Sequence, residues 1–175
     1  GEQRHDHGGQ PRANAGDRCF HCKTELYGTL AALARARGFA AVADGSNADD
    51  RGDYRPGRQA ARDHGVISPL DEVDLGKDEI RALARGLGMA IWDAPASACL
   101  SSRIPHHTEV TAPKLAQIER AEAAVRALGF RVFRVRHFEH LARLEFGKDE
   151  MARALDPAET ARIVAGVTAA GYAEV

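Results

Sequence analysis

The chain has 175 residues, of which 44% are hydrophobic and 28% charged, a composition typical of a globular protein of one domain or slightly more. The formal net charge of −1 provides no basic excess for nucleic acid, and no apolar run is long enough to span a membrane. Three cysteines are too few for a disulfide scaffold. We therefore expect a cytoplasmic protein without nucleic-acid or membrane partners, in which a CxxC motif is more often metal-binding or catalytic.

The two ends of the sequence predict an internal portion of a longer protein. Residues 1–17 are polar and glycine-rich, so we expect a loop or poorly ordered segment without a signal peptide. The first residue is Gly1 rather than methionine, and the final GYAEV resembles a strand that has only begun.

Alternating strands and helices predict a parallel sheet covered by helices in the first part of the chain. Leucines at helical spacing predict a helix over residues 23–37, which Gly38 ends. The further expected elements are a strand at 39–45, a polar loop at 46–57, a short helix at 58–63, a strand at 66–69 and a helix at 75–88. We assign residues 1–104 to this α/β domain.

The pattern changes after residue 104 to that of a smaller α+β module over residues 105–175. A long helix at 113–128 precedes two alternating segments, which predict a hairpin with Glu139 and His140 at its turn. A last helix at 157–170 and the start of a strand at Val175 complete a helix–strand–strand–helix–strand unit.

Cys19 and Cys22 form a CxxC motif, placed just before the first expected helix. This spacing is found in thioredoxin-type redox pairs, zinc sites and iron–sulfur sites, although a redox pair would need a strand before the motif. A zinc site would need a fourth ligand, which His21, His106 or His107 could supply. Packing of the two thiols as small hydrophobic side chains is the less favoured interpretation.

Cys99 lies in the segment PASACLSSR, between Pro95 and Pro105. A thiol followed by hydroxyls and an arginine suits a nucleophile that faces an anionic substrate. From this stretch alone, a buried structural cysteine is the preferred interpretation.

Two further motifs carry charge that could bind ligands. DGSNADD follows an expected strand, at the edge of a parallel sheet where such folds bind ligands, although an Asx-rich turn explains the stretch more simply. Arg134 and Arg136 share one strand face, which would suit a phosphate or a carboxylate pair. Neutralisation by Glu145 on the partner strand is an equally good explanation.

Taken together, NAGDRCFHCK, DGSNADD, YRPG, SPL, KDEIR, WDAPASACLSSRIP and RVRHF occur in one order. This ordered set resembles the LarE family, the ATP-dependent sacrificial sulfur transferases of the PP-loop pyrophosphatase superfamily. The resemblance implies an adenine-nucleotide α-hydrolase-like domain followed by a smaller module, and it implies homo-oligomeric assembly. The family's phosphate loop, SGGxDS, would precede residue 1, so we expect no ATP hydrolysis by these residues alone.

The resemblance also implies a reaction. The family substrate is a pyridinium biscarboxylic acid mononucleotide. ATP with Mg²⁺ converts one of its ring carboxylates to the AMP ester, and pyrophosphate leaves. A sulfur nucleophile then displaces AMP and gives a thiocarboxylate, which matures into a nickel-pincer cofactor. In one family variant the cysteine of the AC motif gives up its own sulfur. In the other, three cysteines hold a [4Fe–4S] cluster that carries an extra sulfide.

We expect the cluster variant, with Cys19, Cys22 and Cys99 as ligands and sulfide or a cysteine desulfurase as the sulfur supply. Motif matching places the substrate phosphate at Arg134 and Arg136, with Ser102 and Arg103 nearby. Glu122 and Glu145 match family acidic positions, and the nucleotide-side loop matches at Asp44, Gly45, Asn47 and Asp50.

Two other classes of protein compete with this interpretation. One is another PP-loop enzyme, either NAD synthetase-like or tRNA-thiolating. A tRNA-thiolating enzyme would need a more basic surface. The other class is a non-catalytic zinc- or iron-binding module.

Overall fold

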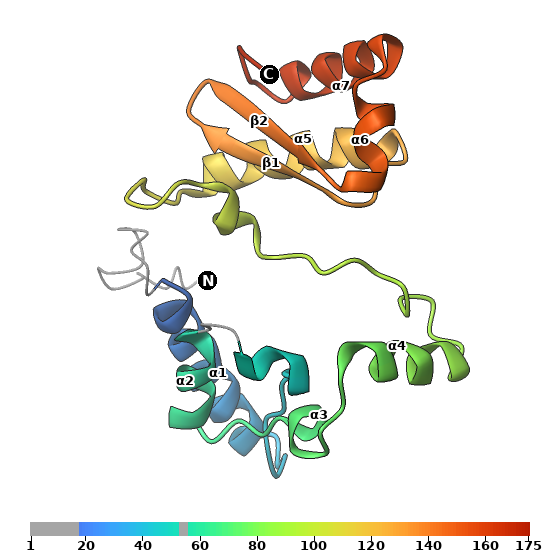
Figure 1. Ribbon diagram of the computed structural model, residues 1–175. Helices are drawn as coiled ribbons and strands as arrows, with labels where there is room; N and C mark the ends of the chain where they lie inside the picture. The colour runs from blue at the N-terminus through green and yellow to red at the C-terminus, as the bar shows by residue number, and fades with distance from the viewer. Residues whose placement is uncertain (1–17, 53–55) are drawn as a thin grey trace. The chain divides into compact units, whose positions relative to one another are not determined.

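The computed structural model describes residues 18–52 and 56–175 (Figure 1). The described chain forms two compact units, an N-terminal unit up to residue 94 and a C-terminal unit over residues 95–175. The sequence predicts a boundary after residue 104, whereas residues 95–104 pack with the C-terminal unit. The loop expected at residues 1–17 and part of the YRPG motif lie outside the described residues.

The N-terminal unit is mainly helical where it is described. Its helices are α1 (Arg18–Ala36), η2 (Ala48–Gly52), α2 (Pro56–Asp63), α3 (Pro69–Glu72) and α4 (Lys77–Gly86). Helices α1 and α2 share a small core of Tyr27, Ala60 and Ala61. Helix α1 begins five residues before the predicted start at residue 23, so Cys19 and Cys22 lie within the helix rather than before it.

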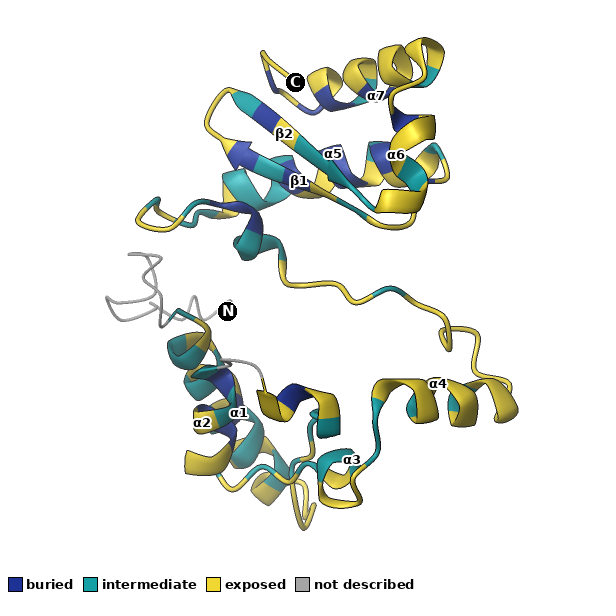
Figure 2. Cartoon of the chain, viewed as in Figure 1, coloured by how far each residue is buried: buried dark blue, intermediate teal, exposed yellow. Residues whose placement is uncertain are grey.

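In the described part of the N-terminal unit, the predicted parallel sheet is represented by the isolated parallel bridge between Ala43 and Ile67. Asp44 N donates to Ile67 O at 2.9 Å, and Ile67 N donates to Val42 O at 3.0 Å. The two segments therefore run parallel, as expected, but neither continues as a regular strand. Figure 2 shows how little of this unit is buried, and α4 has no buried residue. An apolar strand extends only where neighbours cover it, and the described residues supply little cover here.

The C-terminal unit combines a β-hairpin with four helices. Its elements are η3 (Leu100–Arg103), α5 (Ala112–Ala127), β1 (Phe133–Phe138), β2 (Leu141–Phe146), α6 (Lys148–Ala154) and α7 (Pro157–Ala169). The predicted hairpin is confirmed, with Phe133 opposite Phe146 and Phe138 opposite Leu141. Glu139 takes a positive φ of 53° at the turn, as two-residue hairpin turns require.

Helix α6 was not predicted from the sequence. It follows Gly147, whose N–H donates to Val132 O at 2.6 Å. A Cβ at position 147 would lie 2.9 Å from the Cβ of Val132, so only glycine fits where β2 passes into this helix.

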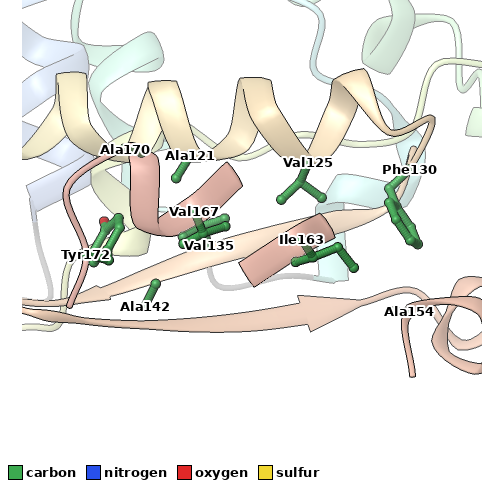
Figure 3. Packing of buried hydrophobic residues seen from close by; sticks show 10 residues of the cluster. All are labelled: Ala121, Val125, Phe130, Val135, Ala142, Ala154, Ile163, Val167, Ala170 and Tyr172. Atoms are coloured by element: carbon green, nitrogen blue, oxygen red, sulfur yellow. The ribbon is translucent and has the colours of Figure 1, made fainter. Parts of the chain in front are cut away.

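The hairpin is buried on one face by helices α5 and α7 (Figure 3). Val135 and Ala142 contribute to the core from the two strands, and Val125 and Val167 contribute from the helices. Because strand side chains alternate, the neighbouring positions Arg134, Arg136 and Glu145 lie on the opposite face. The core thus fixes which charged residues are presented together on the outer face.

Among the described helices, none has the length and apolar character of a membrane span.

His137 and Tyr172 form a buried titratable pair at the core of the C-terminal unit. His137 Nδ1 lies 2.9 Å from the hydroxyl of Tyr172, and both residues are almost fully buried. The other ring nitrogen, Nε2, is buried without a hydrogen-bond partner among the described residues. Burial lowers the pKa of His137 from its ordinary value of 6.5, the charge of Lys114 lowers it further, and Glu139 opposes the shift.

We predict that acid destabilises the C-terminal unit through His137. The unfolded chain takes up the proton at the ordinary pKa, whereas the folded chain resists it, so the free energy of unfolding falls as pH drops below 6.5. His137→Gln, which can still hydrogen-bond to Tyr172, should lose less stability between about pH 7.5 and pH 5.5. Urea unfolding followed by NMR signals of this unit measures the difference. If the free energy of unfolding fell equally with pH in parent and variant, the prediction would be contradicted.

Candidate functional site

The CxxC motif lies on the first turns of α1. Cys19 and Cys22 are both exposed, and residues three apart on a helix share a face. Two exposed thiols on one face suit a metal or cluster site. Taken alone, neither unit gathers three metal-ligating side chains among the residues that the structure describes. The three-cysteine prediction takes its third ligand, Cys99, from the C-terminal unit.

Asp44 is the centre of a hydrogen-bond cluster in the N-terminal unit. Its carboxylate accepts from Ser46 N at 3.1 Å, Ser68 Oγ at 2.8 Å and Tyr27 OH at 3.1 Å. Burial alone would raise the pKa of Asp44, but the hydrogen bonds from Ser68, Ser46 and Tyr27 outweigh it and hold the pKa below 3.8. This carboxylate therefore stays charged at neutral pH.

Asn47 directly precedes η2 and Asp50 lies within it, and both are buried. Asp50 Oδ2 accepts from Asn47 N at 3.3 Å, and Lys77 Nζ lies 3.3 Å from Asp50 Oδ1. The side-chain oxygen of Asn47 accepts no hydrogen bond within the described ranges. At Gly45 nothing lies within 4 Å of the position that a Cβ would occupy. The predicted nucleotide-side residues thus lie close together in the chain, and Gly45 is exposed.

Arg103 and Glu122 form a buried ion pair in the C-terminal unit. Arg103 Nε donates to Glu122 Oε1 at 2.7 Å, and only 3% and 5% of the two side chains are exposed. Glu122 also accepts from Val135 N at 3.2 Å. One carboxylate therefore joins the segment after Cys99 to α5 and to β1. If Arg103 or Glu122 contacts substrate, as the sequence predicts, it has to do so while this ion pair stays formed.

The same arginine holds the backbone beside Cys99. Arg103 Nη1 donates to Ala98 O at 2.8 Å and to Ser102 Oγ at 3.0 Å. From the outer face of β1, Arg136 Nη1 donates to Ser102 O at 2.9 Å. Two arginines thus fix the loop, while the thiol of Cys99 is exposed and lies 3.3 Å from Ser101 Oγ. The expectation of a buried structural cysteine is wrong at position 99.

The two arginines of the RVR motif differ in their surroundings. Arg136 Nε donates to Glu145 Oε2 at 3.0 Å, and Glu145 also accepts from Arg143 at 3.1 Å. Hydrogen bonding to Arg136, assisted by Arg143, lowers the pKa of Glu145 below 4.5. Arg134 is exposed, and its side chain makes no hydrogen bond or ion pair with the described residues. Neutralisation by Glu145 therefore applies to Arg136 but not to Arg134.

Arg134 faces a cavity of about 400 Å³, which we call the arginine cavity. Its charged lining consists of Arg103, Arg126, Arg131, Arg134, Glu122 and Glu145, and it also includes Ser97, Phe133 and Phe146. The size lies in the range of pockets that hold small organic ligands. Arg103 and Glu122 compensate each other, and Glu145 is paired with Arg136 and Arg143, so Arg134 and the largely exposed Arg126 give the cavity a positive charge. It suits an anionic ligand.

Arg126 and Arg131 are cavity residues that the sequence analysis missed. Arg126 is four residues after Glu122 on α5 and so lies on the same helix face. That spacing could have indicated it, once Glu122 was singled out.

The chain is similar to curated proteins of several organisms. It is 47% identical to an uncharacterized protein of Synechocystis sp., over 79% of this chain and 52% of that protein. It is 41% identical to the pyridinium-3,5-bisthiocarboxylic acid mononucleotide synthase of Lactiplantibacillus plantarum, over 75% of this chain and 48% of the synthase. An uncharacterized protein of Methanocaldococcus jannaschii is 29% identical over 83% of this chain and 57% of its own length.

The similarity to the synthase supports the resemblance to the LarE family. The chain spans about half the length of the curated relatives it matches. No family model matches it.

We predict that the Arg103–Glu122 pair is needed for stability of the C-terminal unit. Glu122→Ala leaves a buried guanidinium without its carboxylate, which costs about 3–5 kcal/mol. The double variant Arg103→Met/Glu122→Met removes both charges and should recover part of this loss. Urea unfolding followed by NMR signals of the unit measures each free energy.

The matched control is the exposed pair of Arg162 and Glu159, which are 2.8 Å apart on α7. Arg162→Met should cost less than about 1 kcal/mol, because water screens exposed ion pairs. Equal costs for Glu122→Ala and Arg162→Met would show that burial does not strengthen the first pair.

Proposed function

We propose that this chain belongs to the LarE family and is part of an ATP-dependent sulfur transferase. Its reaction would convert the carboxylates of a pyridinium-3,5-biscarboxylic acid mononucleotide to thiocarboxylates, on the route to a nickel-pincer cofactor. The observation that carries the proposal is the positively charged arginine cavity beside the fixed loop of Cys99 in one unit. The 41% identity to a synthase of the bisthiocarboxylic acid mononucleotide supports the substrate class.

The cavity residues match the chemistry of this substrate. A mononucleotide with ring carboxylates carries several negative charges, and guanidinium groups bind phosphates and carboxylates through paired hydrogen bonds. Arg134 has no competing partner among the described residues and is the first candidate for the phosphate. The aromatic rings of Phe133 and Phe146 offer apolar contact to a ring and a ribose.

The nucleotide side of the proposed reaction uses the loop after the bridge at Ala43. Asp44 is held charged by its hydrogen bonds, which suits a role near Mg²⁺ and ATP. The buried side-chain oxygen of Asn47 could accept a hydrogen bond from the nucleotide. Attack of the substrate carboxylate on the α-phosphorus would release pyrophosphate and form the AMP ester, and sulfur would then displace AMP.

The sulfur donor in this proposal is a [4Fe–4S] cluster held by Cys19, Cys22 and Cys99. All three thiols are exposed, as ligands for an incoming cluster must be. When bound, the cluster would supply the sulfide that reaches the activated carboxylate. Homo-oligomeric assembly, and sulfide or a cysteine desulfurase as the supply, belong to the same proposal.

Anaerobic reconstitution of the full chain should yield about four irons per chain, as a cubane cluster contains. Replacement of any one of Cys19, Cys22 or Cys99 with serine should remove the cluster's visible absorption and most of the iron. The matched control is His21→Ala, which lies between the two motif cysteines and should keep the iron. A complete cluster in Cys99→Ser would rule out the three-cysteine site.

The sulfur source can be determined by intact mass after one turnover with ATP, Mg²⁺ and the mononucleotide, in a protein that joins this chain to the family's SGGxDS phosphate loop. We expect AMP and thiocarboxylate to form, with unchanged protein mass and dependence on added sulfide. If Cys99 were the donor, β-elimination would remove its sulfur and lower the mass by about 34 Da. Dehydroalanine at position 99 in iron-free protein would overturn the cluster route, and absence of AMP would overturn the transferase.

A further inference from the structure

The arginine cavity contains more positive charge than the RVR motif supplies. Arg103 is buried and its guanidinium bonds to Glu122 and to loop oxygens. Arg136 does not line the cavity, and its guanidinium bonds to Glu145 and to Ser102 O. Neither can turn toward a ligand without losing these bonds. A second cation that acts beside Arg134 would therefore be neither Arg103 nor Arg136.

Arg126, in the last turn of α5, is suited to this role. It lines the same cavity as Arg134, and 64% of its side chain is exposed. Its nearest carboxylate oxygen, on Glu122, is 3.9 Å away and already accepts from Arg103. The contact is therefore a weak ion pair.

The aromatic ring of Phe133 also supports the guanidinium of Arg126. Its Cζ lies 5.6 Å from the centre of the Phe133 ring, and a cation stacked on an aromatic face keeps its N–H groups free at the edge of the guanidinium plane. Phe133 precedes Arg134 on β1 and also lines the cavity. Strand β1 thus supplies Arg134 itself and supports Arg126 through the ring of Phe133.

We propose that Arg126 is a second anion-binding arginine of the cavity, which contacts the phosphate of the mononucleotide together with Arg134. This inference rests on the proposed function and adds a residue to it. A phosphate monoester carries up to two negative charges at neutral pH, and two guanidinium groups from different elements could neutralise both. The competing explanation is structural, because a basic residue in the last helical turn also stabilises the helix dipole.

The experiment uses the full chain and two probes that differ only in the phosphate. Nicotinic acid mononucleotide has the phosphate, and nicotinic acid riboside lacks it. Calorimetry gives the dissociation constants of the parent and of Arg126→Met, Arg126→Lys and Arg162→Met. The last variant is the control, because Arg162 lies on α7 outside the cavity.

Arg126→Met should weaken mononucleotide binding by about 10- to 100-fold, as expected for a lost charge-assisted contact, and leave riboside binding unchanged. Arg126→Lys should bind with intermediate affinity, and Arg162→Met should match the parent. Equal affinity of parent and Arg126→Met, or an equal loss for both probes, would overturn the phosphate role of Arg126 while the proposed function stands. Failure of the parent to bind the mononucleotide would overturn the proposed function itself.

Discussion

The buried ion pair between Arg103 and Glu122 is the contact on which the candidate site depends. Both charges are removed from water, which costs several kcal/mol for each ion unless hydrogen bonds replace the lost solvation. Glu122 receives bonds from Arg103 and from the Val135 amide, and Arg103 donates to the carbonyl of Ala98. Because separation would leave two buried charges, the loop of Cys99 has to stay with α5 and β1. This is why residues 95–104 belong to the C-terminal unit.

The arginines of this unit have separate tasks, which follow from their partners. Arg103 and Arg136 are bonded to glutamates and to backbone oxygens of the loop, so they hold its shape. Arg134 and Arg126 face the cavity with little or no compensation among the described residues. Glu122 and Glu145 compensate the charges of Arg103 and Arg136. The charge of Arg134 and of the largely exposed Arg126 is therefore left for an anion.

Sequence periodicity predicted the elements that local contacts determine. Helix α5 and the hairpin follow from apolar spacing, and alternation correctly placed Arg134 and Arg136 on one strand face. Alternation could not show that Arg136 bonds to Glu145 while Arg134 does not, because these contacts depend on the side-chain rotamers and on the position of η3. Helix α6 is only seven residues long, too short for a periodic signal. The expected strands at 39–45 and 66–69 are a single bridge, since strand length depends on neighbours that periodicity does not describe.

The loop of Cys99 combines a fixed backbone with an exposed thiol, and this combination has a chemical consequence. Arg103 and Arg136 bind its oxygens, so the sulfur is held in place without being covered. A cluster ligand and a covalent nucleophile both need such a fixed, accessible sulfur, because each must reach a reacting centre at a set distance. The geometry of Cys99 therefore serves either sulfur route equally well. What favours the cluster is the pair of exposed thiols on one face of α1, Cys19 and Cys22, which a sacrificial cysteine would not require.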